Sequence, residues 1–240
     1  MNWDLICFDL DDTIVDYEQT FKNAVRHCFS IFVGSKLVRF EDWFSLFKKF
    51  CDEYWDDYEC KRMTREEYRR CRFLDTMASL GLKADEKLAD QFHEHFDRVV
   101  SKFVVPIHGI IPFLQHLHSI SVKLGIVTNG KMKTQSEKIH FLGLNSIFPD
   151  DAIIVSETVG IEKPSPEIFE YAYMNLAPNC RHKLFIGDSW EHDVVGALEA
   201  EWEAIYFNTR HQPPTTKHIP LAVCKNAGEL LWTVFSIKFP

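Results

Sequence analysis

The stretch Leu5-Ile6-Cys7-Phe8-Asp9-Leu10-Asp11-Asp12-Thr13 decides the fold that this sequence predicts. Its first four residues form a short apolar run, typical of a buried parallel strand, that ends abruptly in acidic residues. Asp9 and Asp11 are two residues apart in an extended segment, so both side chains are expected on the same side of the chain. On its own, the triplet is explained equally well if Asp11 or Asp12 caps a following helix.

Four later segments repeat this form, because each is an apolar run that ends at polar residues. They are 122–127 before Thr128-Asn129-Gly130, 152–155 before Ser156-Glu157, 183–186 before Gly187-Asp188-Ser189, and 204–207 before Asn208. Helical patterns accompany them at 110–119, 133–142, 166–175 and 193–200. Strands that alternate with helices predict an α/β fold, in which helices cover both faces of a parallel sheet.

Residues 16–105 break this alternation, because the stretch is helical almost throughout. Trp43, Phe47, Phe50 and Tyr54 recur at helical spacing on one face, which favours helix packing and leaves stacking on a base as an alternative. We therefore predict an inserted all-helical domain at 16–105, between a first core segment, 1–15, and a second, 106–240.

Composition excludes several classes of function. The 240 residues carry a net charge of −8 and no basic run, so binding to a nucleic-acid polymer is disfavoured. No apolar run approaches the roughly 20 residues that span a membrane. Seven cysteines without a CxxC pair argue against a zinc cluster and predict reduced thiols in a cytoplasmic protein. Both a monomer and a homodimer remain open.

The polar strand ends are expected to meet, because ligands of open α/β sheets gather at the carboxyl ends of the strands. Asp188 and Asp193 would then join Asp9 and Asp11, and such a group of acids repels itself unless a cation is present. Carboxylate oxygens suit Mg²⁺. The alternative is that Asp188 begins a turn and Asp193 caps a helix.

Phosphoryl transfer is the chemistry that these residues support together. One carboxylate of the Asp9 and Asp11 pair can attack phosphorus while the other handles the proton of the leaving oxygen. Thr128 and Asn129 offer a hydroxyl group and backbone N–H groups to an anion. Lys163, which stands before Pro164, can hold the transferring phosphoryl group, although a solitary loop lysine is often merely solvated.

The sequence resembles the haloacid dehalogenase-like (HAD) hydrolase superfamily over nearly its whole length. Four motifs carry the likeness: 8–13, 127–130, Lys163-Pro164, and Gly187-Asp188-Ser189 with Asp193. The resemblance implies a Rossmann-like core with a helical cap inserted after the first motif. It also implies Asp9 as nucleophile and Asp11 as general acid, then base. Thr128, the Asn129 backbone and Lys163 would grip the phosphoryl group. Mg²⁺ would be held by Asp9, the backbone carbonyl of Asp11, and Asp188, with Asp193 nearby or acting through water.

Within the superfamily, the segment 155–164 and the opening Trp3-Asp4 are most similar to the pyrimidine 5′-nucleotidase-like, house-cleaning branch. This implies a phosphatase of small phosphorylated metabolites, with nucleoside 5′-monophosphates favoured. A sugar-phosphate or phosphoglycolate phosphatase, a phosphomutase and a non-catalytic phosphate-binding module remain alternatives, whereas Asp11 and the Asp188 cluster disfavour a dehalogenase. Glu201 stands where family members usually have a glycine that ends a helix, which predicts a different or slightly strained helix end.

Overall fold

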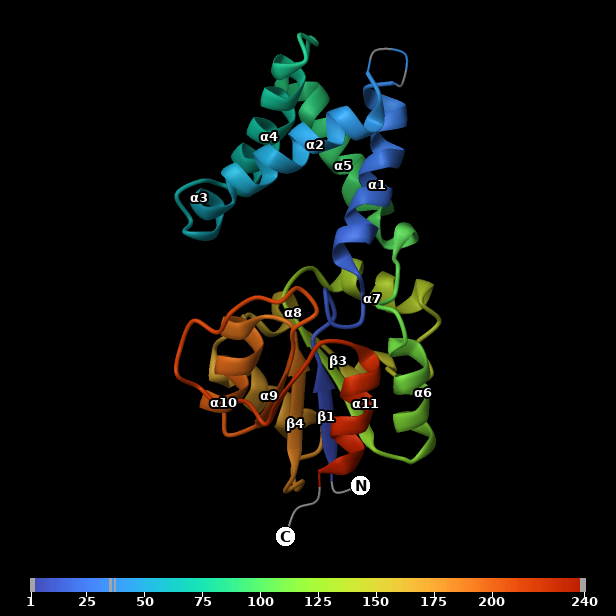
Figure 1. Ribbon diagram of the computed structural model, residues 1–240, viewed down its shortest axis with the longest axis vertical. Helices are drawn as coiled ribbons and strands as arrows, with labels where there is room; N and C mark the ends of the chain where they lie inside the picture. Colours follow the sequence, from blue (N-terminus) through green and yellow to red (C-terminus); the bar gives the residue numbers. More distant parts are fainter. Residues whose placement is uncertain (1–2, 35, 37, 238–240) are drawn as a thin grey trace. The chain divides into compact units, whose positions relative to one another are not determined.

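A computed structural model describes residues 3–34, 36 and 38–237 of the protein (Figure 1). The chain divides into two compact units. Met1–Glu18 and Val104–Pro240 together form one, here called the core unit, and Gln19–Phe103 forms the other, the helical unit. No helix in the described part of the chain is long and apolar enough to cross a membrane.

The core unit is built on a six-stranded sheet in the order β3-β2-β1-β4-β5-β6, in which every neighbouring pair is parallel. The strands are β1 (Leu5–Phe8), β2 (Lys123–Thr128), β3 (Ile153–Val155), β4 (Lys183–Gly187), β5 (Glu203–Phe207) and β6 (Ala222–Cys224). The predicted parallel α/β fold is therefore confirmed. The short edge strand β6 was not predicted from the sequence.

Helices cover both faces of this sheet, and the side chains of β1 alternate between the two layers. Ile6 and Phe8 pack with α6 (Ile110–Ser119), α7 (Met132–Phe141) and α11 (Ala227–Ser236), and Figure 1 shows α6 and α11 along one side of the sheet. Leu5 and Cys7 pack against the other layer. That layer contains α8 (Ser156–Val159), α9 (Pro166–Leu176), a π-helix, η3 (Trp190–Val195), and α10 (Gly196–Glu199). All four β1 side chains are fully buried, which explains the uninterrupted apolar run.

The segment after β4 differs from the single helix predicted at 193–200. The π-helix η3 comes first and α10 follows. The chain then leaves α10 through Glu201, whose φ of 59° lies in the left-handed region that glycine tolerates best. The strained helix end expected from a glutamate at this position is therefore present. A short 3₁₀ helix, η2 (Asp150–Ala152), precedes β3.

The helical unit has its own aromatic core. Its elements are α1 (Tyr17–Phe32), which begins in the core unit, α2 (Phe40–Glu53), α3 (Trp55–Glu59), α4 (Arg65–Ser79), α5 (Glu86–Val99) and the 3₁₀ helix η1 (Val100–Phe103). Trp43 and Phe47 are fully buried in this core, while Phe50 and Tyr54 are only partly buried. The stripe of aromatic residues on α2 thus contributes mainly to helix packing.

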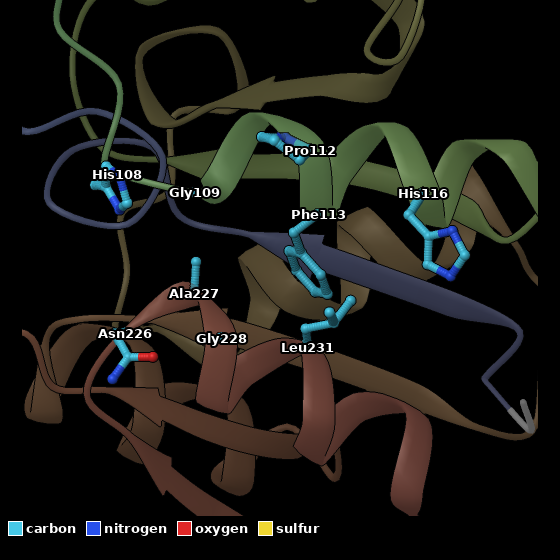
Figure 2. A pocket seen from close by; sticks show the side chains of 9 residues that line it. All are labelled: His108, Gly109, Pro112, Phe113, His116, Asn226, Ala227, Gly228 and Leu231. Atoms are coloured by element: carbon cyan, nitrogen blue, oxygen red, sulfur yellow. The ribbon is translucent and has the colours of Figure 1, made fainter.

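A hollow of about 630 Å³ lies between α6 and α11 of the core unit (Figure 2). Its lining is largely apolar and includes Phe113 and Leu231, with His108, His116 and Asn226 among the polar residues. None of the acids predicted to react or to bind metal borders it. The predicted chemistry therefore lies elsewhere on the core unit, at the carboxyl ends of the strands.

Candidate active site

The predicted site residues lie at or beyond the carboxyl ends of four strands of the sheet. They are Asp9 and Asp11 after β1, Thr128 and Asn129 at the end of β2, Lys163 beyond β3, and Asp188 and Asp193 after β4. In the strand order, β1 lies between β2 and β4. The chain adds β2 and β3 on one side of β1 and then β4, β5 and β6 on the other side. Such a switch point is where open α/β sheets bind ligands. The backbone N–H of Asp9 donates to the Ile186 carbonyl at 2.9 Å, which fixes Asp9 at the end of β1.

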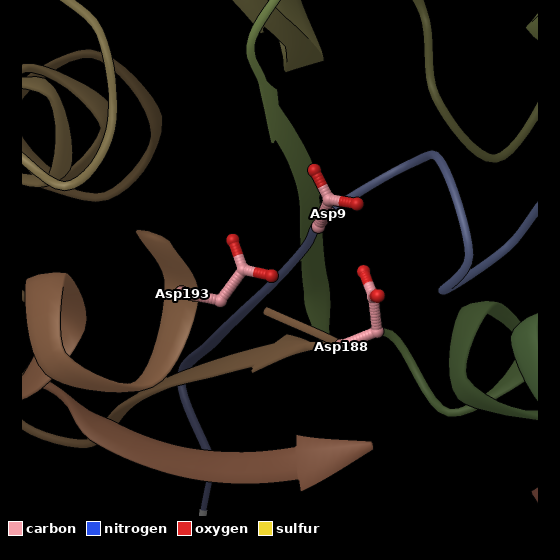
Figure 3. Close-up of side chains that lie close together, drawn as sticks. All are labelled: Asp9, Asp188 and Asp193. Carbon is pink, nitrogen blue, oxygen red and sulfur yellow. The ribbon is translucent and has the colours of Figure 1, made fainter. Parts of the chain in front are cut away.

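Three carboxylates meet at this point (Figure 3). Asp9, Asp188 and Asp193 each place a carboxylate oxygen within 4.8 Å of the other two, and all three residues are at least nine-tenths buried. Asp11 is outside this group of three. The structure therefore brings together three of the four predicted metal residues by their side chains.

A buried lysine lies among these acids. Lys163 Nζ is 2.6 Å from Asp9 Oδ1 and 2.6 Å from Asp193 Oδ1. Burial opposes the charge of this ammonium group, yet the neighbouring carboxylates of Asp193 and Asp9 raise the pKa of Lys163 above its usual value. Lys163 is consequently a charged part of the site, and not a solvated loop lysine.

The loop that carries Lys163 is tied to the end of β2 by a pair of hydrogen bonds. Asn129 Nδ2 donates to the Lys163 carbonyl at 3.0 Å, and the Lys163 N–H donates to Asn129 Oδ1 at 2.9 Å. Thr128 is buried beside it, where its hydroxyl accepts from Gln135 Nε2 at 3.0 Å. The Asn129 side chain thus positions Lys163, a role that its place in the motif did not predict.

Asp193 is held by a close approach to the end of β4. Its Oδ2 accepts from the Ser189 N–H at 2.9 Å, so both of its oxygens have partners. A Cβ atom at Gly187 would lie 2.3 Å from Asp193 Oδ2, so only glycine leaves room for this carboxylate. The π-helix that begins at Trp190 carries Asp193, whose carboxylate lies close to those of Asp9 and Asp188.

Asp11 and Asp12 have cationic partners of their own. Lys138 Nζ lies 2.7 and 2.6 Å from the two oxygens of Asp11. Arg210 lies 2.9 Å from Asp12 Oδ2 and also contacts Asp188. The acids at the strand ends are therefore divided among Lys163, Lys138 and Arg210.

Three residues of the site were not predicted from the sequence: Lys138, Gln135 and Arg210. A polar residue on a helix is usually solvated, and Lys138 and Gln135 lie within a helix and not at a strand end. The sequence did contain one signal for Gln135 and Lys138. They are three residues apart, so they share a face of their helix, and this helix closely follows the Thr128-Asn129-Gly130 turn. Arg210 follows β5 by three residues, so its position at a strand end could have indicated it.

The acidic cluster suits a divalent cation. Burial raises the pKa of Asp9, and Lys163 opposes this increase. Burial also raises the pKa of Asp188, and the charges of Asp9 and Asp193 add to the effect. Close buried carboxylates of this kind are costly unless further positive charge compensates them. Oxygen ligands from carboxylates are those that Mg²⁺ and similar hard cations take.

Comparison with known proteins finds matches that cover most of this chain. The family model for haloacid dehalogenase-like hydrolases matches residues 3–201. The HAD-hydrolase YfnB of Bacillus subtilis is 29% identical over 226 residues, which cover 94% of this chain and 92% of that protein. A magnesium-bound crystal structure of YfnB superimposes with a TM-score of 0.82 at 27% identity and covers 99% of this chain and 100% of that one.

Two further relatives carry names of defined phosphatases. The pyrimidine 5′-nucleotidase YjjG of Escherichia coli is 27% identical, with 88% of this chain and 89% of that protein covered. The glyceraldehyde 3-phosphate phosphatase of Methanopyrus kandleri is 26% identical, with 81% and 79% covered.

Proposed function

Because the chain belongs to the haloacid dehalogenase-like hydrolase family, we propose that it is a magnesium-dependent phosphatase that passes the phosphoryl group of a small metabolite through Asp9. The observation that carries this proposal is the arrangement of Asp9, Asp188 and Asp193 around the Lys163 ammonium at the switch point of the sheet. A carboxylate nucleophile beside a lysine and a cation site matches the needs of phosphoryl transfer.

The residues that would hold Mg²⁺ are Asp9, Asp188 and the backbone carbonyl of Asp11, with Asp193 completing the acidic set. Both oxygens of Asp193 already accept hydrogen bonds, from Lys163 and from the Ser189 backbone, which favours a supporting role or binding through water. When bound, the cation would neutralise charge on the phosphoryl oxygens.

The chain's own residues then account for both halves of the reaction. Asp9 attacks phosphorus to form an aspartyl-phosphate, while Lys163 offsets the charge that develops on the phosphoryl oxygens. Asp11 gives its proton to the leaving oxygen, and later takes a proton from the water that hydrolyses the aspartyl-phosphate. The Thr128 hydroxyl and the Asn129 backbone N–H are proposed to bind the phosphoryl group.

The substrate is proposed to be a nucleoside 5′-monophosphate, with sugar phosphates as the alternative. Support comes from the relative named as a pyrimidine 5′-nucleotidase, and the alternative comes from the one named as a glyceraldehyde 3-phosphate phosphatase. We propose that the helical unit is a cap that selects the leaving group. Two of its α4 arginines already have acidic partners, since Arg69 pairs with Asp97 and Arg70 with Asp90.

A phosphate-release screen tests the proposal. The purified chain is assayed with Mg²⁺ against nucleoside monophosphates, sugar phosphates and phosphoglycolate, with the Asp9→Asn variant as control. We expect release by the wild type, loss of activity in EDTA, and no turnover by folded Asp9→Asn. Release that persists in Asp9→Asn would refute the role of Asp9. No release by the wild type from any of these compounds would favour a phosphate-binding module.

A further inference from the structure

Lys138 is a lysine that the proposed mechanism does not use, although it is buried within the core unit. It lies on α7 with its side chain only 4% exposed, and Gln135, one turn earlier on the same face, is also buried. Lys133, in the same helix, is exposed. A buried ammonium group is costly unless it is paired, so the contacts of Lys138 must offset its burial.

Those contacts converge on one carboxylate. Lys138 Nζ reaches both oxygens of Asp11, and Gln135 Nε2 donates to Asp11 Oδ2 at 3.1 Å. The same Gln135 nitrogen is 3.0 Å from Thr128 Oγ1 and 3.1 Å from the Asn129 carbonyl. Asp11 is thereby joined to the segment proposed to bind the phosphoryl group.

The two buried lysines serve different acids. Lys163 contacts Asp9 and Asp193, whereas Lys138 contacts Asp11. Asp11 is 29% exposed at its side chain and would otherwise be free to change rotamer. A cation that contacts both carboxylate oxygens restricts the orientation of the group, as proton transfer to a particular oxygen requires.

We propose that Lys138, assisted by Gln135, is a positioning residue that holds the Asp11 carboxyl group for proton transfer. This proposal rests on the proposed phosphatase function. In the first step the Asp9–phosphorus bond forms, the bond from phosphorus to the leaving oxygen breaks, and the Asp11 proton moves to that oxygen. In the second step, water attacks phosphorus, its proton moves to Asp11, and Asp9 is released with inorganic phosphate. Lys138 keeps its own protons throughout and acts only by holding the Asp11 carboxyl group in place through its contacts with both oxygens.

Two substrates of similar size separate positioning from a general structural effect. The leaving group of p-nitrophenyl phosphate departs without a proton, whereas benzyl phosphate must release an alkoxide and needs one. Proton transfer from a positioned acid contributes about 10²–10⁴-fold to rate. In Lys138→Met, we expect kcat/KM to fall about 100-fold for benzyl phosphate and less than about 5-fold for p-nitrophenyl phosphate. The exposed Lys133→Met variant is the matched control and should equal the wild type for both.

A double variant keeps the test valid if Lys138→Met alone unfolds. Asp11→Asn with Lys138→Met removes both charges together, so no unpaired charge remains. If Lys138 acts through Asp11, the double variant should have the kcat/KM of Asp11→Asn alone on benzyl phosphate. Equal losses on both substrates in Lys138→Met, or a double variant with a lower kcat/KM than Asp11→Asn on benzyl phosphate, would overturn the positioning role while the phosphatase proposal stands. A wild type inactive on both substrates with Mg²⁺ would overturn both proposals.

Discussion

Replacing Lys163 by methionine removes the positive charge that two buried acids share. In the wild type, Lys163 Nζ is 2.6 Å from an oxygen of Asp9 and from one of Asp193, and both acids are at least nine-tenths buried. Removing one partner of a buried ion pair costs about 3–5 kcal/mol, because the other charge stays buried without compensation. With a urea m-value of about 2–3 kcal/mol/M, the midpoint of unfolding should fall by roughly 1–2.5 M in EDTA.

Mg²⁺ should reverse part of this loss. A cation bound among Asp9, Asp188 and Asp193 supplies positive charge to the same carboxylates, and a ligand that binds only the folded state stabilises it. Urea unfolding of Lys163→Met is therefore measured in EDTA and in Mg²⁺, with Lys123→Met, an exposed lysine at the start of β2, as control. The reasoning is refuted if Lys163→Met and Lys123→Met unfold at the same urea concentration in EDTA.

Three further predictions concern stability and the geometry of the site. Burial and the nearby Arg72 guanidinium hold the pKa of His93 well below its usual range, so the unfolded state binds a proton that the folded state does not as the pH falls below about 6.5. Below about pH 6.5, the free energy of unfolding of the helical unit should fall by up to about 1.4 kcal/mol per pH unit. Urea titrations in which His93→Gln shows the same dependence on pH would contradict the assignment of this effect to His93. The left-handed conformation of Glu201 costs about 1–2 kcal/mol, and Glu201→Gly removes this strain but gives the unfolded chain more conformational freedom. We therefore expect the free energy of unfolding in urea to rise by about 0.5–1 kcal/mol. A fall in this free energy would show that the backbone at Glu201 is not strained. Gly187→Ala should weaken Mg²⁺ binding, measured by calorimetry, and lower kcat/KM more than about 10-fold, because its Cβ would displace Asp193. Binding equal to that of the wild type would show that Asp193 can move without consequence.

The strand ends were predictable because each buried strand is an apolar run that stops at a polar residue. That pattern alone assigns Asp9, Thr128 and Asp188 to strand ends, and the parallel arrangement brings them to one edge. It does not place Lys138, whose burial depends on the packing of α7 against the rest of the core unit. Nor does it place the Asn129 side chain, whose partner lies 34 residues away.

The C-terminal elements were missed for two different reasons. Strand β6 has three residues, of which only Cys224 is buried, so it is too short for an alternating pattern. Helix α11 had a usable signal, since the Asn226 side chain accepts from the Glu229 N–H at 2.9 Å and Asn-x-x-Glu is a common helix start. The π-helix η3 has no comparable signal, because its i to i+5 bonds leave little trace in residue types.

The strand β1 is far in sequence from the two strands that it pairs with, which affects how the protein folds during its synthesis. The strand ends at Phe8, but β2 begins only at Lys123 and β4 at Lys183. At about 5–20 residues per second of synthesis, β1 has left the ribosome roughly 10–35 s before both of its partners exist. During that interval the helical unit, whose contacts are local, can fold, while a strand that is apolar on both faces stays unpaired. The nascent chain should therefore depend on chaperones most strongly before residue 187 is synthesised.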